Sequence, residues 1–400
     1  MTTSDERPGP RPISLHMAMA MWTWAGSLAA LPLVQSGSMR WMPKLAAEAA
    51  RLTATLGEAD PPALAAAVEK EATERAAALV EAIDDYRAYP YTRDAVDPDA
   101  IMRVGAAALR DYGGDGPPTM FVPSLVNRAY ILDLSRRRSM LRWLSARGVH
   151  PYLLDWGTPG AAEKVFSLAD YIDGPLKASL SAMCDRHGAP VHLVGYCMGG
   201  NVALAAALRY PDYVSSLALL ATPWDFHADR GSAAGLLSPG GPIEQTIAAT
   251  GEIPVDLLQA FFASLDPMLA ARKFRAFAAL ADDDPAREDF VALEDWLNDG
   301  VPLAGPVARE CFFDWYGENQ PGRGVWRVGE TLIDPGALDC PSFVVLPDND
   351  RLVPPGSARA LADRLPDPKI HAPAAGHVGM VVGRSAEQGL WAPLRDWLID

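Results

Sequence analysis

The stretch VHLVGYCMGG at residues 191–200 places a cysteine at the centre of a glycine-rich turn. Gly195 and Gly199 stand two residues before and after Cys197, and an apolar segment leads into the turn. In a strand–turn–helix nucleophile elbow the central residue has a strained backbone, so its neighbours must be small where the helix crosses the strand. The positive end of the following helix favours a thiolate at that position. We therefore predict that Cys197 is a catalytic nucleophile.

A cysteine nucleophile needs a base, and three histidines follow Cys197 in the chain. Where such an elbow is used, the chain order is nucleophile, acid and then histidine. His377 stands in the small-residue loop AAGHVGM directly after a predicted late strand, which is the expected place. His371 falls inside that strand, and His227 comes too early in the chain. These positions favour His377 as the base.

The base needs an acid that orients it, and the loop in FVVLPDNDRLVPP offers two. Asp348 and Asp350 both follow an apolar strand, which is where this acid should stand. Asp350 directly precedes RLVPP, and we prefer it as the acid, partly because of the resemblance described below. The other carboxylate is then expected to serve as a turn residue.

An acyl-transfer site also needs backbone N–H groups that stabilise the negative charge of the tetrahedral intermediate. The N–H of Met198, directly after the nucleophile, is the expected first donor. The second donor should come from the loop after the first buried strand, which lies in TMFVPSLVNRAY. We therefore predict that the backbone N–H groups of Ser124 and Leu125 supply it.

Short apolar segments alternate with helical ones from about residue 102, and these elements must position the reactive groups. Strands are predicted at 104–112, 119–125, 150–156, 191–196, 214–221, 341–347 and 369–373. Helices are predicted at 168–187, 198–209, 356–365 and 386–399. Apolar strands between helices are typical of a mostly parallel sheet with helices on both faces. Together with a nucleophile elbow, this α/β pattern predicts the α/β-hydrolase fold.

The alternation breaks between about residues 225 and 325. This segment contains helical, aromatic-rich stretches such as LLQAFFASLDPM and DFVALEDWLNDG, and it is too long and too apolar to be a loop. We predict a helical cap here, inserted into a catalytic domain that covers residues 101–400.

Residues 1–100 are predicted to form an N-terminal helical extension, with helices at 41–57 and 63–87 followed by a Tyr/Pro linker. Residues 17–39 carry no charge and are long enough to span a membrane. The segment also contains glycine, proline and several polar residues, and much of its apolar character comes from alanine. We therefore expect a surface helix that packs on the protein or contacts an apolar partner.

The composition restricts the classes of function. The chain has 400 residues, of which 49% are hydrophobic and 21% charged, so it can bury a sizeable core. Its formal net charge of −15 disfavours broad binding to nucleic acid or to anionic lipid. Cys184, Cys311 and Cys340 stand far apart, without the spacing of a metal site, so we expect structural thiols, no metal and a reducing cytoplasm.

Seven stretches carry a resemblance: VPSLVNRAYILDL, YLLDWGTPG, SLADYI, LVGYCMGGNVALA, LALLATPWDF, DNDRLVPP and GHVGMVVG, in this order. Together they resemble the catalytic subunit of polyhydroxyalkanoate synthases, most closely the short class III type, over roughly residues 100–398. The resemblance places the triad of that family on Cys197, Asp350 and His377. It implies transfer of 3-hydroxyacyl groups from coenzyme A onto a polyester chain, with no bound metal or redox cofactor.

The resemblance also implies partners. Class III catalytic subunits usually act with a second, non-catalytic subunit, so a homodimer or a second synthase subunit is expected, at the surface of a polyester granule. Residues 1–100 have no obvious counterpart in that class. A hydrolase of the same fold, such as an intracellular polyester depolymerase or a thioesterase, is the alternative, because fold and triad do not determine the acceptor.

Sulfur suits an acyl-CoA donor, because attack by a cysteine exchanges one thioester for another and keeps the transfer potential of the acyl group. Water must then be excluded, and an aromatic-rich cap is a reasonable means. The phosphates of coenzyme A need cationic partners, for which the sequence offers two weak candidates. These are Arg136–Arg138 and a cluster of Arg272, Lys273 and Arg275.

Overall fold

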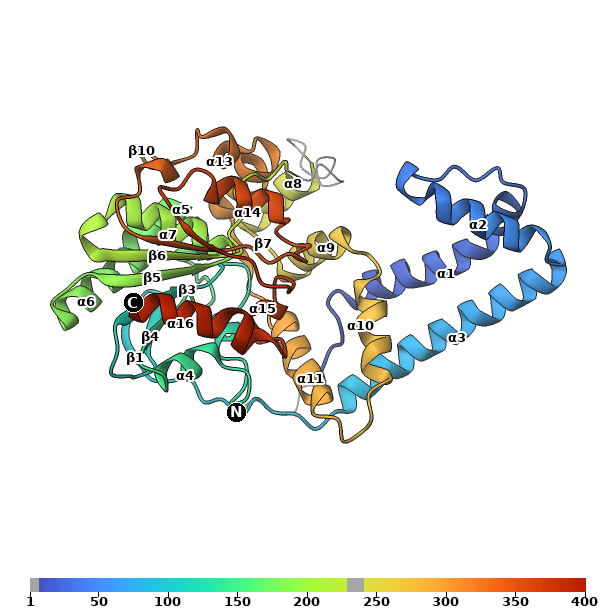
Figure 1. Ribbon diagram of the computed structural model, residues 1–400, viewed down its shortest axis with the longest axis horizontal. Coiled ribbons are helices and arrows are strands. Elements are labelled where there is room, and N and C mark those ends of the chain that lie inside the picture. The colour runs from blue at the N-terminus through green and yellow to red at the C-terminus, as the bar shows by residue number, and fades with distance from the viewer. Residues whose placement is uncertain (1–6, 229–240) are drawn as a thin grey trace. The chain divides into compact units, whose positions relative to one another are not determined.

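Figure 1 shows the computed structural model of the chain, in which residues 7–228 and 241–400 are described. The chain forms two compact units. The first comprises the residues up to Tyr91 together with Gln259–Glu294. The second comprises Thr92–Leu258 and Asp295–Asp400, and it contains all the predicted site residues.

This division differs from the predicted one at two places. The predicted boundary lay at residue 100, whereas the first unit ends at Tyr91 in this part of the chain. The predicted cap at 225–325 is divided, because Gln259–Glu294 shares an apolar core with the N-terminal helices. The sequence pattern shows that this segment is helical, but it does not show which partner covers its apolar face.

The second unit is built on an eight-stranded sheet with the order β1-β2-β4-β3-β5-β6-β11-β12. The strands are β1 (Ala100–Val104), β2 (Ala107–Asp111), β3 (Pro118–Val122), β4 (His150–Asp155), β5 (Val191–Tyr196), β6 (Val214–Leu220), β11 (Ser342–Val345) and β12 (Lys369–His371). Only the β1–β2 and β2–β4 pairings in this sheet are antiparallel. The prediction of a mostly parallel sheet is therefore confirmed.

The predicted strand at 104–112 is wrong in one respect, because a hairpin turn interrupts it. Val104 pairs with Ala107 across the antiparallel β1–β2 hairpin, and Gly105 in the turn has φ of 57°. Two-residue hairpins need this left-handed backbone, which glycine adopts without steric cost. Because the residues around Gly105 are apolar, the sequence pattern does not indicate a turn there.

Helices cover both faces of this sheet, with α7 and α14 on one face and α16 on the other (Figure 1). The helices are α4 (Met140–Ser145), α5 (Leu168–Tyr171), α6 (Lys177–His187), α7 (Met198–Arg209), α14 (Pro355–Ala362), α15 (Gly379–Val382) and α16 (Ala392–Ile399). A π-helix, η4 (Ile172–Leu176), joins α5 to α6, and another, η9 (Glu387–Trp391), precedes α16. The first ten residues of α7 are all buried, as expected for a helix at the centre of the domain.

The segment between β6 and β11 supplies further short elements. They are α8 (Pro242–Thr250), β7 (Glu252–Ile253), α9 (Val255–Leu265), α10 (Leu269–Ala278), α11 (Pro285–Asn298), β8 (Leu303–Ala304), α12 (Gly305–Arg309), η7 (Glu310–Gly317), α13 (Gln320–Arg323), β9 (Arg327–Val328) and β10 (Thr331–Leu332). Of these, η7 is an eight-residue π-helix, a rare form that is frequent at functional sites.

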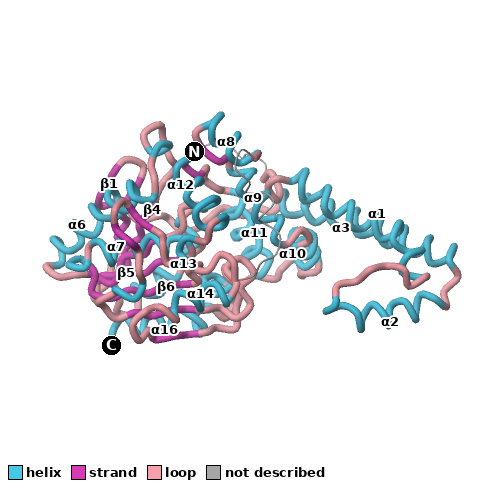
Figure 2. The backbone as a smooth tube through the Cα atoms, turned by 90° about the horizontal axis from the view of Figure 1, so that it is seen from above, coloured by secondary structure: helices cyan, strands magenta, loops and turns pink. Residues whose placement is uncertain are grey.

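The first unit contains three N-terminal helices, α1 (Ile13–Gln35), α2 (Ala46–Gly57) and α3 (Pro61–Ala88), together with α10. Figure 2 shows α1 and α3 as long helices that lie side by side. The core of this unit consists of Ala20, Leu79, Ala82, Ile83, Tyr86, Ala271, Phe274, Phe277 and Val291. The helix α3 starts at the two prolines, where Asp60 accepts a hydrogen bond from the Ala63 N–H.

The helix α1 is long and apolar enough to cross a membrane by length and composition alone. Ala20 is buried in the core of the first unit, with Met17 and Trp24 packed against it. Trp22 on the same helix is 81% exposed. One side of α1 therefore packs on the protein, while apolar side chains remain exposed along the rest of its surface.

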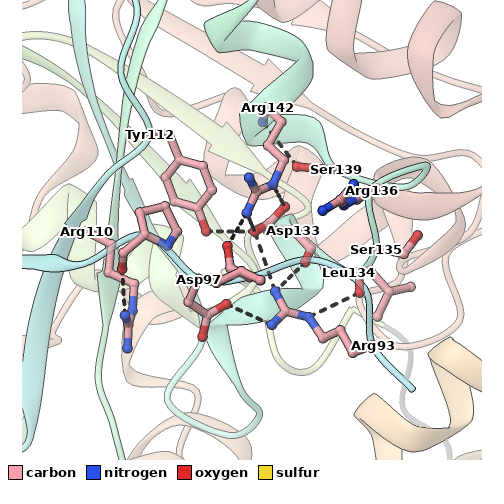
Figure 3. A network of polar contacts seen from close by, with 12 residues as sticks. Arg93, Asp97, Arg110, Tyr112, Asp133, Leu134, Ser135, Arg136, Ser139 and Arg142 are labelled. Atoms are coloured by element: carbon pink, nitrogen blue, oxygen red, sulfur yellow. Dashed lines mark hydrogen bonds and ion pairs between the residues drawn. The ribbon is translucent and has the colours of Figure 1, made fainter. Parts of the chain in front are cut away.

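A buried carboxylate anchors the segment that enters the second unit (Figure 3). Asp133 is fully buried and accepts hydrogen bonds from Arg142 at 2.8 and 2.9 Å and from the Tyr112 hydroxyl at 3.1 Å. Arg93 reaches the same carboxylate at 3.4 Å and pairs with Asp97 at 2.8 Å. The predicted linker is therefore held against β2 and α4 at this point.

Candidate active site

Cys197 lies between β5 and α7 with a strained backbone, at φ 56° and ψ −129°. Two hydrogen bonds hold it there: its N–H donates to the Leu220 carbonyl, and its carbonyl accepts from the Gly200 N–H, both at 2.9 Å. A non-glycine residue persists in such a conformation only where the surrounding structure imposes it. This strand–turn–helix geometry is that of a nucleophile elbow.

The glycines around Cys197 leave room for close backbone contacts. A Cβ on Gly195 would overlap the backbone of Gly200, and one on Gly199 would overlap the carbonyl oxygens of Val122 and Pro123. Neither obstacle is a flexible side chain that could move away. The small residues at these positions are therefore required for β3, β5 and α7 to meet at the elbow.

The structure brings Cys197, His377 and Asp350 together. His377 Nδ1 lies 2.6 Å from Asp350 Oδ2, and the His377 side chain is hydrogen-bonded to that of Cys197. The other carboxylate oxygen of Asp350 accepts from the N–H groups of Leu352 and Val353, each at 2.8 Å. Asp350 is 5% exposed and His377 is 8% exposed. These contacts form a continuous chain from carboxylate to imidazole to thiol, in the order of a triad.

The environment favours a charged imidazole. Burial alone would lower the pKa of His377, but the negative charge of Cys197 and the hydrogen bond to Asp350 outweigh it and raise the pKa to about 10. An imidazolium beside a thiolate is the activated form of a cysteine nucleophile. The imidazole of His377 can therefore stay charged beside the Cys197 thiol at neutral pH.

The remaining candidate acids and bases point elsewhere. Asp348 is exposed, whereas Asp350 is buried against the imidazole. The His371 Nε2 lies 2.6 Å from the Gly389 carbonyl oxygen, and the His227 Nε2 lies 2.9 Å from the Tyr316 carbonyl oxygen. Their ring contacts are therefore with backbone carbonyl groups.

The proposed oxyanion donors lie around the elbow. Met198 is the first residue of α7, directly after Cys197. Ser124 and Leu125 follow Pro123, whose carbonyl lies close to Gly199 and accepts a 3.0 Å hydrogen bond from the Trp156 indole. The Ser124 hydroxyl accepts from the Val126 N–H at 3.1 Å and so turns this loop. The donor roles themselves stay predictions.

Two residues of η7 lie near enough to the nucleophile for its charge to act on them, and the sequence does not reveal this. Burial raises the pKa of the Cys311 thiol and of the Tyr316 hydroxyl, and the charge of Cys197 contributes to both shifts. The sequence predicts a structural thiol at Cys311 and does not single out Tyr316 within the aromatic-rich cap. A π-helix has no recognised sequence signal, which is why their position beside the elbow was not found.

Three of the basic residues considered for phosphate binding are engaged within the protein. Arg136 donates from its backbone and its side chain to Asp94. Lys273 pairs with Glu294 at 2.7 Å, and Arg272 pairs with Asp266.

A separate cavity of about 420 Å³ is also rich in arginine. Each of its three arginines pairs with an aspartate, as Arg93–Asp97, Arg110–Asp155 and Arg128–Asp299. Its walls therefore carry equal numbers of arginine and aspartate side chains. Among the described ranges 7–228 and 241–400, no group of three His, Cys, Asp or Glu side chains is placed to hold a metal.

Comparison with known proteins agrees with this geometry. A family model described as the alpha/beta hydrolase fold matches residues 131–383, which is more than half of the chain. A solved structure of a thermophilic esterase from Thermogutta terrifontis is 19% identical, covers 76% of this chain and 97% of that chain, and gives a TM-score of 0.45. The match to the family model shows that the fold is that of the α/β hydrolases, as predicted.

Closer relatives are known by sequence. The poly(3-hydroxyalkanoate) polymerase subunit PhaC of Synechocystis is 31% identical over 293 residues, covering 70% of this chain and 77% of that protein. The subunit of the same name from Thiocystis violacea is 31% identical over 286 residues, covering 70% of this chain and 80% of that protein. The chain therefore belongs to the poly(3-hydroxyalkanoate) polymerase family, which confirms the resemblance found in the sequence.

Proposed function

We propose that the protein is an acyltransferase that polymerises 3-hydroxyacyl groups from coenzyme A thioesters into a polyester, through an acyl intermediate on Cys197. The observation that carries the proposal is the Cys197–His377–Asp350 chain on a nucleophile elbow, in a member of a polymerase family. Asp350 orients the imidazole through Nδ1, and His377 holds the proton taken from the Cys197 thiol.

In the first half-reaction the Cys197 thiolate attacks the thioester carbonyl of the acyl-CoA. Backbone N–H groups at Met198 and in the Ser124–Leu125 loop stabilise the tetrahedral oxyanion. The C–S bond to coenzyme A breaks, and the departing thiolate takes the proton from His377. One thioester replaces another, so the acyl group keeps its transfer potential.

In the second half-reaction a 3-hydroxyl group replaces coenzyme A as the partner. His377 removes the hydroxyl proton, and the oxygen attacks the thioester on Cys197. An ester bond forms and the Cys197 thiolate leaves, restoring the starting ion pair. Each cycle forms one ester and releases one coenzyme A, and these steps balance without a metal or a redox cofactor.

The proposal includes a partner. The relatives are named as polymerase subunits, which supports assembly either with a second synthase subunit or as a homodimer. We place the reaction in the cytoplasm, at or near the polyester surface. Mass measurement of the purified full chain, alone and during polymerisation, would separate a monomer from these assemblies.

The test of the activity is to incubate the full chain with 3-hydroxybutyryl-CoA and to follow coenzyme A release and insoluble polymer together. We expect both products in parallel. Release of coenzyme A with only free hydroxy acid as the organic product would overturn the polymerase proposal in favour of the hydrolase alternative.

The role of the nucleophile is tested by Cys197→Ala. Removal of the nucleophile of a triad costs several orders of magnitude, so we expect turnover to fall by about 10⁴-fold or more. Cys184→Ala is the matched control, because Cys184 donates to the Tyr213 carbonyl in a different part of the domain. Retained activity in Cys197→Ala would show that the mechanism is wrong.

A further inference from the structure

Tyr196 lies directly before the nucleophile, at the end of β5, and makes two contacts with His377. Its hydroxyl donates to the His377 backbone carbonyl at 3.2 Å, across 181 residues of sequence. Its ring stacks on the imidazole, with the ring centroids 5.2 Å apart and the ring planes at 26°. Tyr196 is 4% exposed, so both contacts are shielded from solvent.

The hydroxyl contact fixes the backbone that carries the imidazole. The N–H groups of Val381 and Val382 both bond to the Val378 carbonyl, so the turn that opens α15 begins after His377. The His377 carbonyl is left for a donor from outside the helix, and Tyr196 supplies one. A buried carbonyl without a donor is costly, so this hydrogen bond helps to determine where His377 projects from the chain.

The ring contact acts on the charge of the imidazole. Since the pKa of His377 is raised, the imidazole beside Tyr196 is held as a cation at neutral pH. The face of an aromatic ring attracts a cation within about 6 Å of its centroid. Burial, together with the charges of Cys197 and Asp350, raises the pKa of Tyr196 well above its usual value, so the hydroxyl stays protonated and remains a donor.

We propose that Tyr196 is a positioning residue that holds His377 at the nucleophile and stabilises its charged form. The inference rests on the proposed function, in which His377 carries the proton of the Cys197 thiol. No bond forms or breaks at Tyr196, which acts only through His377. The residue directly before the nucleophile thus ties the elbow to the loop that supplies the base.

The titratable groups that face this ion pair come from several elements. Asp350 contacts the imidazole from the loop after β11, and Tyr196 contacts it from β5. The charge of Cys197 acts on Cys311 and Tyr316 of η7, and burial raises both of their pKa values, which keeps them neutral. The two η7 side chains are therefore neutral, and Asp350 is the carboxyl group that contacts the imidazole.

Two kinds of substitution separate the two contacts. Tyr196→Phe keeps the ring and removes the hydroxyl donor, so we expect kcat to fall by about threefold to tenfold with KM unchanged. Tyr196→Leu and Tyr196→Met remove the ring as well, and we expect kcat to fall by about 100-fold, because small misplacements of a base have effects of this size. KM should again stay within about twofold, since Tyr196 is buried and acts through His377.

The decisive readout is the pH dependence of Cys197 alkylation by iodoacetamide, which reports the thiolate and needs no turnover. Loss of the ring weakens the imidazolium, so the pH of half-maximal alkylation should rise by about one unit in Tyr196→Leu. In Tyr196→Phe the pH of half-maximal alkylation should rise by less than about half a unit. Mass spectrometry of the modified peptides distinguishes alkylation of Cys197 from that of the other cysteines.

Tyr152 provides a matched control in the same sheet. It is fully buried on β4, its ring stacks on His150 at 4.6 Å, and its hydroxyl lies 2.9 Å from the His187 Nε2. Tyr152→Phe and Tyr152→Leu should lower the melting temperature by amounts similar to those of the Tyr196 variants. They should leave both kcat and the alkylation profile of Cys197 unchanged.

The inference is overturned if the folded Tyr196→Leu or Tyr196→Met protein keeps the wild-type alkylation profile and kcat. It is also overturned if the Tyr152 variants shift the profile equally, because the effect would then be one of general stability. If neither ring-deletion variant folds, an unchanged kcat in Tyr196→Phe overturns the hydroxyl contact on its own. Failure of the proposed function is distinguishable, since it would appear as retained activity in Cys197→Ala.

Discussion

Two tyrosine–histidine stacks lie at opposite ends of the strands of one sheet, and their chemistry differs. At the carboxyl end of β5, Tyr196 stacks on His377, whose pKa is raised to about 10 because the charge of Cys197 and the bond to Asp350 outweigh burial. At the amino end of β4, Tyr152 stacks on His150 and contacts His187. There burial lowers the pKa of His187, and the neighbouring positive charges add to the effect.

The difference shows how the surroundings of the proposed catalytic base differ from those of an ordinary histidine. Both regions contain a buried tyrosine, an imidazole and an aspartate, and Asp111 lies 2.6 Å from His150 just as Asp350 lies 2.6 Å from His377. Only the carboxyl end adds a thiol on a strained turn at the start of a helix. Ligands of parallel α/β sheets bind at this end, where strands lead into loops.

The largest effect should separate the two aspartates. Asp350→Asn leaves the shape of the site intact but removes the carboxylate that fixes the imidazole tautomer and stabilises the imidazolium, so we expect kcat to fall by about 10³- to 10⁴-fold. Asp111→Asn, beside His150 at the amino end of β4, should change kcat by less than about twofold. The measurement is coenzyme A release from 3-hydroxybutyryl-CoA under identical conditions. A loss smaller than tenfold in Asp350→Asn would contradict the assignment of the acid.

The elbow illustrates what the sequence determines locally. The strand at 191–196 and the helix at 198–209 were predicted with the bounds that the structure shows. Three constraints coincide there, namely an apolar strand, glycines where backbones touch, and a helix that starts directly after the nucleophile. The order of nucleophile, acid and base then limited His377 to one loop, because the fold itself restricts where each can stand.

The parts that were missed depend on contacts between distant segments. Tyr196 looks like any strand residue until the loop of His377, 181 residues away, is placed on it. The partner of Gln259–Glu294 is a set of helices near the N-terminus, which periodicity cannot identify. The π-helix η7 changes the helical register, so that Tyr316 lies near enough to the nucleophile for its charge to act on it. The residue types do not indicate this change of register.

A smaller effect should appear in the pH dependence of stability. A histidine whose pKa rises on folding contributes stability that is full below its unfolded value of 6.5 and is lost as pH rises through about 10. We therefore expect wild type to melt above His377→Gln by roughly 5 °C at pH 7, and this gap to narrow by pH 10.5. Thermal unfolding followed by circular dichroism measures both.

The site around His187 should show the opposite pH dependence of stability. A histidine whose pKa falls on folding costs no stability above about 6.5 and destabilises the protein as pH decreases below that value. His187→Gln should therefore match wild type at pH 8 and become the more stable of the two at pH 5. The difference in melting temperature between wild type and variant should change in opposite directions with pH for His377→Gln and His187→Gln. If both differences changed in the same direction, the contrast between the two sites would be wrong.

The smallest effect concerns a buried acid that has no positive partner of this kind. Burial, with the nearby carboxylates of Asp314 and Asp170, raises the pKa of Glu310 to about 7, and the Leu168 N–H, 3.0 Å away, only partly offsets these effects. An acid with a raised pKa destabilises the folded state as pH rises above its ordinary value of 4.5. Glu310→Gln keeps an oxygen for Leu168 and removes the charge, so it should raise the melting temperature by about 2 °C at pH 8 and change it little at pH 5. A lower melting temperature at pH 8 would mean that the carboxylate charge of Glu310 stabilises η7, contrary to the principle that separates the two histidine sites.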